Sequence, residues 1–451
     1  MRLKSTHPAP SDRPAPSGVP HQQAEVPLDA QIPVTFFAVG VVFFALGVSV
    51  LPFAVSRIDQ YFYQAIPLAV VHVFTLGWIT AVIMGVMYRY VPALTRTALP
   101  SPRLAWIQLA LYVIGASGMI THFAIGIWPG LWLAATIVFA SILMFAWNIL
   151  PGVMSQVGRG VAETGMFLSV CFLIAAALLG TLLGLDKTYD FLGGSLLTNL
   201  AAHVHLAAVG WVTLSICAVS YRMLPAFLLP TIQLPVAAKW QIYALTMTVV
   251  GLVGSLLLRC GMASTFTIAI TLSMGWYLVI VARMVRTRRM PLDWTPLHAL
   301  AGVIGLAMAA GLGIGLSFAG GDSALGARLA PAYGAMGLLG FFSNFIVGMS
   351  YQLFPGFVTR ARTSARRAGV TIAEISVFRT RLFVFLTLNG GVLLLAGGFV
   401  ENAVHIAQLG ATLITVAGLV YSAVTLWTLS FAFRESIPRA APETTLRILP
   451  E

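Results

Sequence analysis

The chain has 451 residues, of which 59% are hydrophobic and only 9% are charged, and its mean hydropathy is +0.91. A soluble domain of this length needs far more polar surface, so the composition excludes a soluble protein and indicates a polytopic membrane protein. The formal net charge of +12 does not indicate nucleic-acid binding, because the basic residues lie in segments between apolar stretches. That placement is typical of topology signals beside anionic headgroups, so the expected partner is membrane lipid and not nucleic acid.

Residues 1–32 are rich in Pro, Ser, Gln and Ala and have no apolar core, which predicts a disordered cytoplasmic tail. A second cytoplasmic tail is expected at residues 432–451. Between them, apolar stretches of about 20 residues have the length that a bilayer-spanning helix requires. The predicted all-α membrane domain, residues 33–431, has twelve spans at 33–55, 65–91, 104–126, 130–150, 163–185, 198–224, 237–258, 262–283, 296–318, 329–354, 381–400 and 403–431.

The basic residues predict the orientation of these spans. If the N-terminus lies inside, the inner segments hold 22 of the 26 lysines and arginines. The outer loops hold the other four, which are Arg57, Lys187, Arg259 and Arg328. An excess of this size on one side indicates the cytoplasmic face. We therefore expect a multi-pass protein of a bacterial-type inner (plasma) membrane with both termini in the cytoplasm.

One motif occurs three times along the chain. The copies run from His72 to Pro92, from His205 to Pro225 and from Ala335 to Pro355. The motif glycine precedes the motif proline by 15 residues in each copy, and successive copies are 133 and 130 residues apart. Regular self-similarity defines architecture, and here the motif opens the second, sixth and tenth spans. We predict three four-helix pseudo-repeats, at about 33–150, 163–283 and 296–431.

Two copies of the motif begin with histidine, and a further histidine, His203, precedes His205 by two residues. Ionisable residues inside a membrane are functional candidates, and neutral imidazole is a common haem ligand. Residues two apart on a helix project about 200° apart, so His203 and His205 face different pockets. Since His72 aligns with His205, we expect this pair to bind a haem iron axially, with His203 as a ligand on the other face. The alternative is that these histidines only bridge helices.

The other membrane histidines, His122, His298 and His405, lie near span ends, where a structural role is expected. Scaffold roles are also expected for the rest of the motif. Its glycines allow helices to approach closely, its tyrosines suit an aromatic belt at the membrane surface, and its prolines end the helices. The spans as predicted contain no carboxylate near their middle, which argues against a proton-coupled transporter with an acidic relay. The three cysteines occur singly, which indicates small apolar residues and not a metal site.

The stretch His203-Val-His205-Leu-Ala-Ala-Val-Gly-Trp, continuing to Tyr221 and Pro225, resembles a signature of haem-copper oxidase subunit I, especially its cbb-type branch. The resemblance implies the twelve-span fold in three four-helix arcs. It also implies that His203 and His205 are haem ligands, and that His72 lies on the span that supplies the opposite ligand of the low-spin haem. The chain departs from the family in two respects. Its HxH helix is span 6 and not span 10, and the histidines that bind copper in the family have no counterpart, so copper is not expected.

A weaker similarity exists to NnrS-type membrane haem proteins of the nitric-oxide response, which also have a histidine opening a glycine-containing second span. Together these resemblances imply one or two b-type haems. They imply electron transfer, or handling or sensing of a diatomic gas such as nitric oxide or oxygen, without a complete copper centre. An enzyme of this kind would be an oxidoreductase of the cytochrome oxidase or nitric oxide reductase type, with cytochrome c or another redox subunit as partner. The alternative is a non-catalytic, oxidase-like scaffold that acts as a carrier or an assembly partner.

Overall fold

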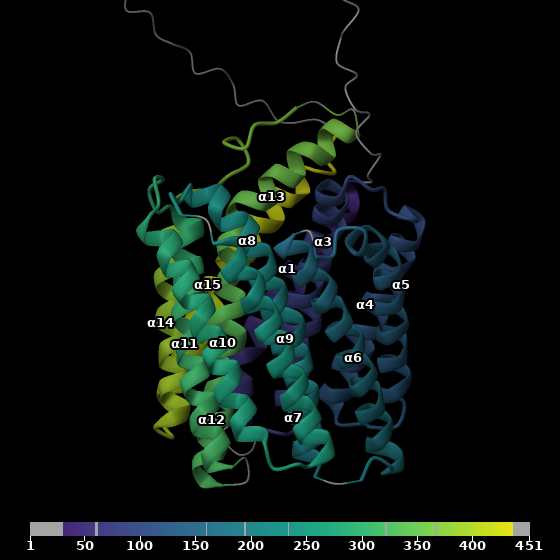
Figure 1. Cartoon of the computed structure of the whole chain (residues 1–451), viewed down its shortest axis with the longest axis vertical. Coiled ribbons are helices and arrows are strands. Elements are labelled where there is room, and N and C mark those ends of the chain that lie inside the picture. Colours follow the sequence, from purple (N-terminus) through teal and green to yellow (C-terminus); the bar gives the residue numbers. More distant parts are fainter. Residues whose placement is uncertain are drawn as a thin grey trace, which may run out of the picture.

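The computed structural model describes residues 30–435 apart from 59–61, 159, 194, 233, 321, 322, 366 and 368. The two expected tails therefore lie almost wholly outside the described residues. Within the described part, twelve helices are long and apolar enough to cross a membrane, and strands are absent. The helices run side by side along the long axis of the molecule (Figure 1). The predicted all-α, twelve-span fold is confirmed.

The spans form three units of four, each with the motif in its second span. Unit 1 comprises α1 (Gln31–Ile58), the continuous span α2 (Ala65–His72), η1 (Val73–Thr80) and α3 (Ala81–Thr95), then α4 (Pro102–Ile125) and α5 (Leu131–Met154). Unit 2 comprises α6 (Val161–Tyr189), the span α7 (Leu196–His205), η2 (Leu206–Thr213) and α8 (Leu214–Leu228), then α9 (Pro235–Leu258) and α10 (Ala263–Arg286). Unit 3 comprises α11 (Trp294–Ala319), the span α12 (Ala324–Ala335), η3 (Met336–Ser343) and α13 (Asn344–Ser364), then α14 (Arg381–Val400) and α15 (Val404–Ser430).

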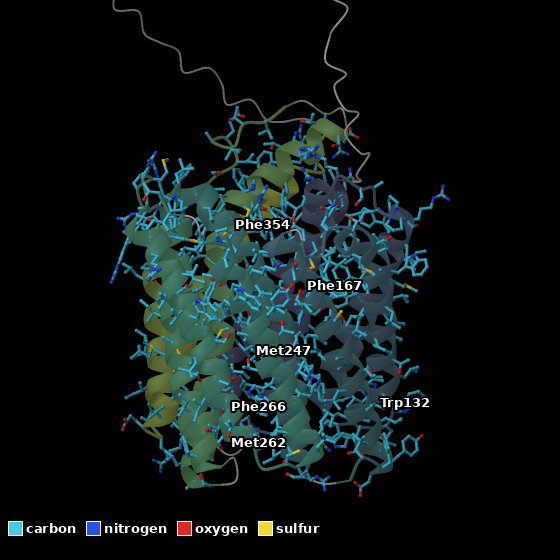
Figure 2. The ribbon with its side chains drawn as sticks, viewed as in Figure 1. Trp132, Phe167, Met247, Met262, Phe266 and Phe354 are labelled. Atoms are coloured by element: carbon cyan, nitrogen blue, oxygen red, sulfur yellow. The ribbon has the colours of Figure 1, made fainter. Side chains whose placement is uncertain are left out.

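The sides of the bundle are apolar, as contact with lipid requires. Met247 of α9, for example, is 64% exposed on the side of the bundle (Figure 2). α4 and α11 begin with side-chain caps: the hydroxyl of Ser101 accepts from the backbone N–H of Leu104, and the carboxylate of Asp293 accepts from that of Thr295. Such caps satisfy N–H groups that the first turn of a helix leaves without partners. At these two spans the sequence therefore marks where the helix begins.

Each motif span contains a π-helical segment of eight residues, and all three segments begin directly after the first motif position. π-Helical turns are rare in proteins and occur mostly at functional sites. The helix interrupted in this way loses the regular 3.6-residue register between its two halves. Apolar periodicity gives no sign of this change, and the sequence did not predict it.

The π-helical segments are joined at the centre of the bundle by indole hydrogen bonds. The indole N–H of Trp78 in unit 1 donates to the hydroxyl of Ser343 in unit 3, at 3.3 Å. The indole N–H of Trp211 in unit 2 donates to the hydroxyl of Thr80 in unit 1, at 3.1 Å. Phe341 stands at the third tryptophan position, and it has no N–H to donate. Two of three equivalent links between units are therefore present.

The motif glycines allow close helix packing, as predicted. A Cβ atom on Gly77 would lie 2.5 Å from the ring of Phe43, and one on Gly210 would lie 2.6 Å from the ring of Phe172. The prediction for the prolines was wrong. α3 and α8 continue for three residues beyond Pro92 and Pro225, and α13 continues for nine beyond Pro355. A proline removes one backbone hydrogen bond, and membrane helices tolerate that loss where neighbouring groups compensate.

The motif tyrosines are not in an aromatic belt at the membrane surface, so that prediction was also wrong. Tyr88 is fully buried, and its hydroxyl donates to Gln108 of α4 at 3.2 Å. Tyr221 makes the same contact with Gln241 of α9, at 2.9 Å. A buried hydroxyl needs a partner, and the glutamine one span later supplies it. These tyrosines hold the second and third spans of their units together.

α13 extends beyond the rest of the bundle at the upper end of Figure 1. Near its end, Arg362 is fully buried and donates to the carbonyl oxygens of Phe431 and Arg434, at 2.6 and 2.8 Å. These carbonyls follow the C-terminus of α15, where backbone acceptors have no helical partner. Arg362, one of the basic residues of the expected inner segments, therefore also closes the end of a helix.

Candidate functional site

His72 is the last residue of α2, directly before the π-helical segment η1. Its Nδ1 lies 2.7 Å from the carbonyl oxygen of Leu68, one turn earlier on the same helix. The ring stacks on Phe123 of α4, with centroids 4.5 Å apart and planes 28° apart. His72 therefore points from the second span of unit 1 toward the third.

His203 lies in α7, and its side chain reaches the preceding span. Its Nδ1 is 3.0 Å from the carbonyl oxygen of Ala176 on α6. Gly180 leaves room for the ring, because a Cβ there would lie 2.7 Å from Cε1 of His203. From this position His203 is close enough to His72 for the two rings to interact electrostatically.

His205 repeats the local geometry of His72 in unit 2. Its Nδ1 lies 2.7 Å from the carbonyl oxygen of Ala201, again one turn earlier. The expected pairing of His72 with His205 stays a prediction. His203 and His205 project about 200° apart from α7, so only one of them can face the same pocket as His72.

The hydrogen bonds of the three histidines determine their tautomers. A carbonyl oxygen can only accept, so each Nδ1 must carry the proton and donate it. The lone pair of each Nε2 is then free to bind an iron or another acceptor. An imidazole oriented by an Nδ1–H bond to a backbone carbonyl is the usual arrangement of a histidine ligand. The donor atoms are therefore preset for coordination.

The same three side chains are only partly buried. His298, by contrast, is 0% exposed. The three candidate ligands therefore keep part of their surface open, as ligands of a bound group must.

A metal ion held by the protein alone does not fit these residues. Over the described part of the chain, no group of three or more His, Cys, Asp or Glu side chains could hold a metal. A single ion needs about four protein ligands in a closed site, or three in an open one. Two imidazoles on opposite sides of an iron suffice only where a macrocycle supplies the remaining nitrogens. The donor set therefore fits a haem.

An aromatic cluster with one cation lies next to this site, and the sequence did not predict it. Phe123, which covers His72, is 6.1 Å from Trp128 between ring centroids. The ammonium of Lys187 lies 4.8 Å from the ring centroid of Trp128 and 4.4 Å from that of Tyr63. Burial, together with the charge of Asp186, raises the pKa of Tyr63 to about 12. The cluster draws on three separate segments, so no spacing in the sequence could have indicated it.

The other membrane histidines are not part of this site. The Nδ1 of His122 donates to the carbonyl oxygen of Ile127 within a turn, and His405 is exposed. His298 bridges α11 and α13 through Asn344, at 3.0 Å. These positions agree with the structural roles expected of them, with His298 alone fully buried.

Comparison with known proteins supports the fold. The chain is similar to a haem-copper terminal oxidase whose dimer was determined by cryo-electron microscopy, with a TM-score of 0.67 and 13% sequence identity. The match covers 91% of this chain and 85% of that one. No family model and no curated protein matches the sequence. The resemblance to haem-copper oxidase subunit I is thereby borne out at the level of the fold, in a multi-pass membrane protein.

Proposed function

We propose that the protein is a membrane haem protein, in which Nε2 of His72 and Nε2 of His203 bind the iron of one b-type haem between units 1 and 2. Two observations support this proposal: each ring donates its Nδ1–H to a backbone carbonyl, and the two imidazoles interact electrostatically across the units. His205, on the opposite side of α7, is the candidate ligand of a second haem. Haem iron, when bound, supplies reversible one-electron chemistry and, with an open axial position, gas binding.

The protein's own residues have three tasks at this site. The carbonyls of Leu68 and Ala176 keep the proton on Nδ1 of the two histidines and fix the directions of their rings. Phe123 covers one face of His72 and excludes water from it. Gly180 provides the room that the ring of His203 occupies. Oriented, dry imidazoles of this kind are what tunes the affinity and potential of a bound metal.

The physiological role that we propose is electron transfer, or the handling or sensing of a diatomic gas such as nitric oxide or oxygen. Cytochrome c or another redox subunit would be the partner. The distribution of basic residues supports an inner-membrane location with cytoplasmic termini. On this assignment the histidine site lies toward the outer face, because α2 and α7 begin there. The missing histidine pair supports a protein without a copper centre.

The first experiment is a reduced-minus-oxidised optical spectrum of the purified protein, with metal analysis of the same sample. The proposal predicts sharp b-type bands, at least one iron per chain and no copper. Protein that is folded and free of haem would exclude the proposal and leave the non-catalytic carrier or assembly partner. Copper in stoichiometric amount would instead indicate an oxidase centre that the residues do not explain.

Single substitutions then identify the ligands. His72→Ala and His203→Ala should each abolish the low-spin spectrum. His205→Ala should leave that haem in place, and His405→Ala, which changes an exposed histidine, serves as the control. Loss of the low-spin bands in His205→Ala, with retention in His203→Ala, would contradict the pairing proposed here. It would favour the pairing of the two motif histidines instead.

A further inference from the structure

Among the histidines that the structure describes outside the candidate haem site, one is fully buried, and it lies in unit 3. His298 is in the second turn of α11, at the end of the bundle opposite to the start of α2 and α7, and is 0% exposed. Its Nε2 has no hydrogen-bond partner among the residues that the structure describes. Buried polar atoms are nearly always paired, so such an atom calls for a functional explanation.

Asn344 determines which nitrogen of His298 carries the proton. The side-chain nitrogen of Asn344 donates to the carbonyl oxygen of Gly340 and to Oδ1 of Asn389, each at 3.0 Å. Its Oδ1 is therefore the atom that faces Nδ1 of His298, at 3.0 Å, and it can only accept. Nδ1 then carries the proton, and Nε2 is a base with a free lone pair. The imidazole is set to accept a proton at Nε2.

Unit 1 has an equivalent ring contact in which a phenylalanine stands in place of the histidine. There Phe36 packs on Gly85 and lies 5.4 Å from the ring of Tyr88. In unit 3, His298 packs on Gly348 and lies 5.6 Å from the ring of Tyr351. The two pairs occupy equivalent positions, because each glycine precedes its motif tyrosine by three residues. At this position unit 1 therefore has an apolar ring, whereas unit 3 has a titratable ring.

The motif tyrosines of the two units differ in the hydrogen bonding of their hydroxyl groups. Tyr88 donates to Gln108, whereas the buried hydroxyl of Tyr351 has no partner within the described ranges. Unit 3 therefore places two polar groups with unused hydrogen-bonding capacity, an imidazole nitrogen and a phenol, on adjacent rings. The two groups make no hydrogen bond to each other, so transfer of a proton between them requires one bridging water.

Charged and polar groups continue from Tyr351 toward the end of the bundle where α11 begins. The guanidinium of Arg381, the first residue of α14, lies 4.7 Å from the ring centroid of Tyr351. Asp293, the cap of α11, interacts electrostatically with Arg381 and accepts from the side-chain amide of Gln352 at 3.1 Å. On α15, Tyr421 donates to Ser350 at 2.9 Å. The titratable groups that face His298 and Tyr351 are therefore Arg381, Asp293 and Tyr421.

We propose that His298 is a proton-binding site, loaded through Tyr351 from the membrane face at which α11 begins. A hydronium ion at that face gives one proton to the Tyr351 oxygen and leaves water, while the Tyr351 hydroxyl gives its own proton toward Nε2; an N–H bond forms there, and neutral imidazole becomes imidazolium. Release to the same face reverses the step, so no oxidant or reductant takes part. Chains of ionisable groups inside membrane proteins are known for this role. The site is independent of haem, and it stands whether or not a haem binds in units 1 and 2.

The test is nitrogen NMR of the full-length protein, labelled with ¹⁵N-histidine, in lipid bilayers. His298→Phe, which copies Phe36 of unit 1, identifies the signal of His298, and His298→Gln gives a second assignment if the first variant does not fold. We expect the signal to change reversibly from neutral to cationic within about pH 3 to 9, a range that extends well below the ordinary histidine pKa of about 6.5 because charging a buried ring is costly. The exposed His405 provides a titrating reference.

The path is tested by the rate at which the ring protons exchange with water. Tyr351→Phe should slow this exchange about 100-fold, the lower end of what one positioned acid–base group contributes. Tyr88→Phe, the matched variant in unit 1, should leave the rate unchanged. An imidazole that stays neutral over the whole range, or an exchange rate that Tyr351→Phe does not alter, would overturn the proposal.

Discussion

Units 1 and 3 each pack a ring against the glycine that precedes the motif tyrosine by three residues, and in both units that ring contacts the tyrosine. The chemistry of the two rings differs. Unit 1 has a histidine at the first motif position and an aromatic ring on Gly85. Unit 3 has Ala335 at the first position and an imidazole on Gly348. The packing positions are shared, whereas the titratable groups have moved to opposite ends of the bundle. This difference indicates that the scaffold tolerates new chemistry wherever the glycine contacts are kept.

The largest loss of stability is expected where a side chain is added to a tightly packed glycine. Gly77→Ala in unit 1 should destabilise the protein by about 3 kcal/mol, because its Cβ would lie 2.6 Å from Cβ of Phe43, an atom that cannot move without the backbone. Gly340→Ala in unit 3 should have little effect, since its nearest neighbour is the flexible Met336, at 3.2 Å. Thermal unfolding in detergent measures both. Equal losses in the two variants would show that space at the glycine does not decide the outcome.

Removal of Arg362 should have the next largest effect, confined to unit 3. Arg362→Met keeps most of the side-chain volume and deprives the carbonyls of Phe431 and Arg434 of their donor. We expect a loss of about 2 kcal/mol, the usual contribution of hydrogen bonds to a charged group. Hydrogen exchange should increase at the end of α15 and not in unit 1. A uniform increase over both units would contradict the local role of this arginine.

The comparison of Tyr88 with Tyr351 gives a smaller and sharper test. Tyr88→Phe should cost about 1 kcal/mol, because it leaves Gln108 without its donor. Tyr351→Phe should be neutral or slightly stabilising, because its hydroxyl has no partner to lose within the described structure. Unfolding of the two variants under identical conditions decides between them. A larger loss in the unit 3 variant would mean that Tyr351 has a partner after all.

Whether a feature of this protein could be predicted from the sequence depends on how far apart along the chain its interacting residues lie. The number of spans depends on local hydropathy, and that prediction is confirmed. The contact between His203 and Ala176 depends on the packing of α7 on α6, which nothing near His203 in the sequence indicates. Likewise, nothing near Tyr88 in the sequence marks Gln108 as its partner. Side-chain partners 20 or more residues apart require the structure.

The smallest effect is expected in the connection that distinguishes unit 3. Sixteen residues separate α13 from α14, against six between α3 and α4. Within the longer connection, the carboxylate of Glu374 accepts from the backbone N–H of Thr371 at 2.7 Å and from its hydroxyl at 2.9 Å. These two hydrogen bonds, the backbone one first, hold the pKa of Glu374 below its ordinary value of 4.5.

A carboxyl group whose pKa is lower in the folded state stabilises that state above its unfolded pKa. The contribution of Glu374 should therefore be present at neutral pH and disappear as the pH falls through its folded pKa. Thr371→Val removes the hydroxyl donor and should raise the pKa of Glu374 toward the ordinary value, which carbon NMR of labelled glutamate can follow. Because Glu374 is exposed, the global unfolding temperature should hardly change. A large change would mean that the long connection of unit 3 supports the whole bundle, and the comparison with unit 1 would then have to include it.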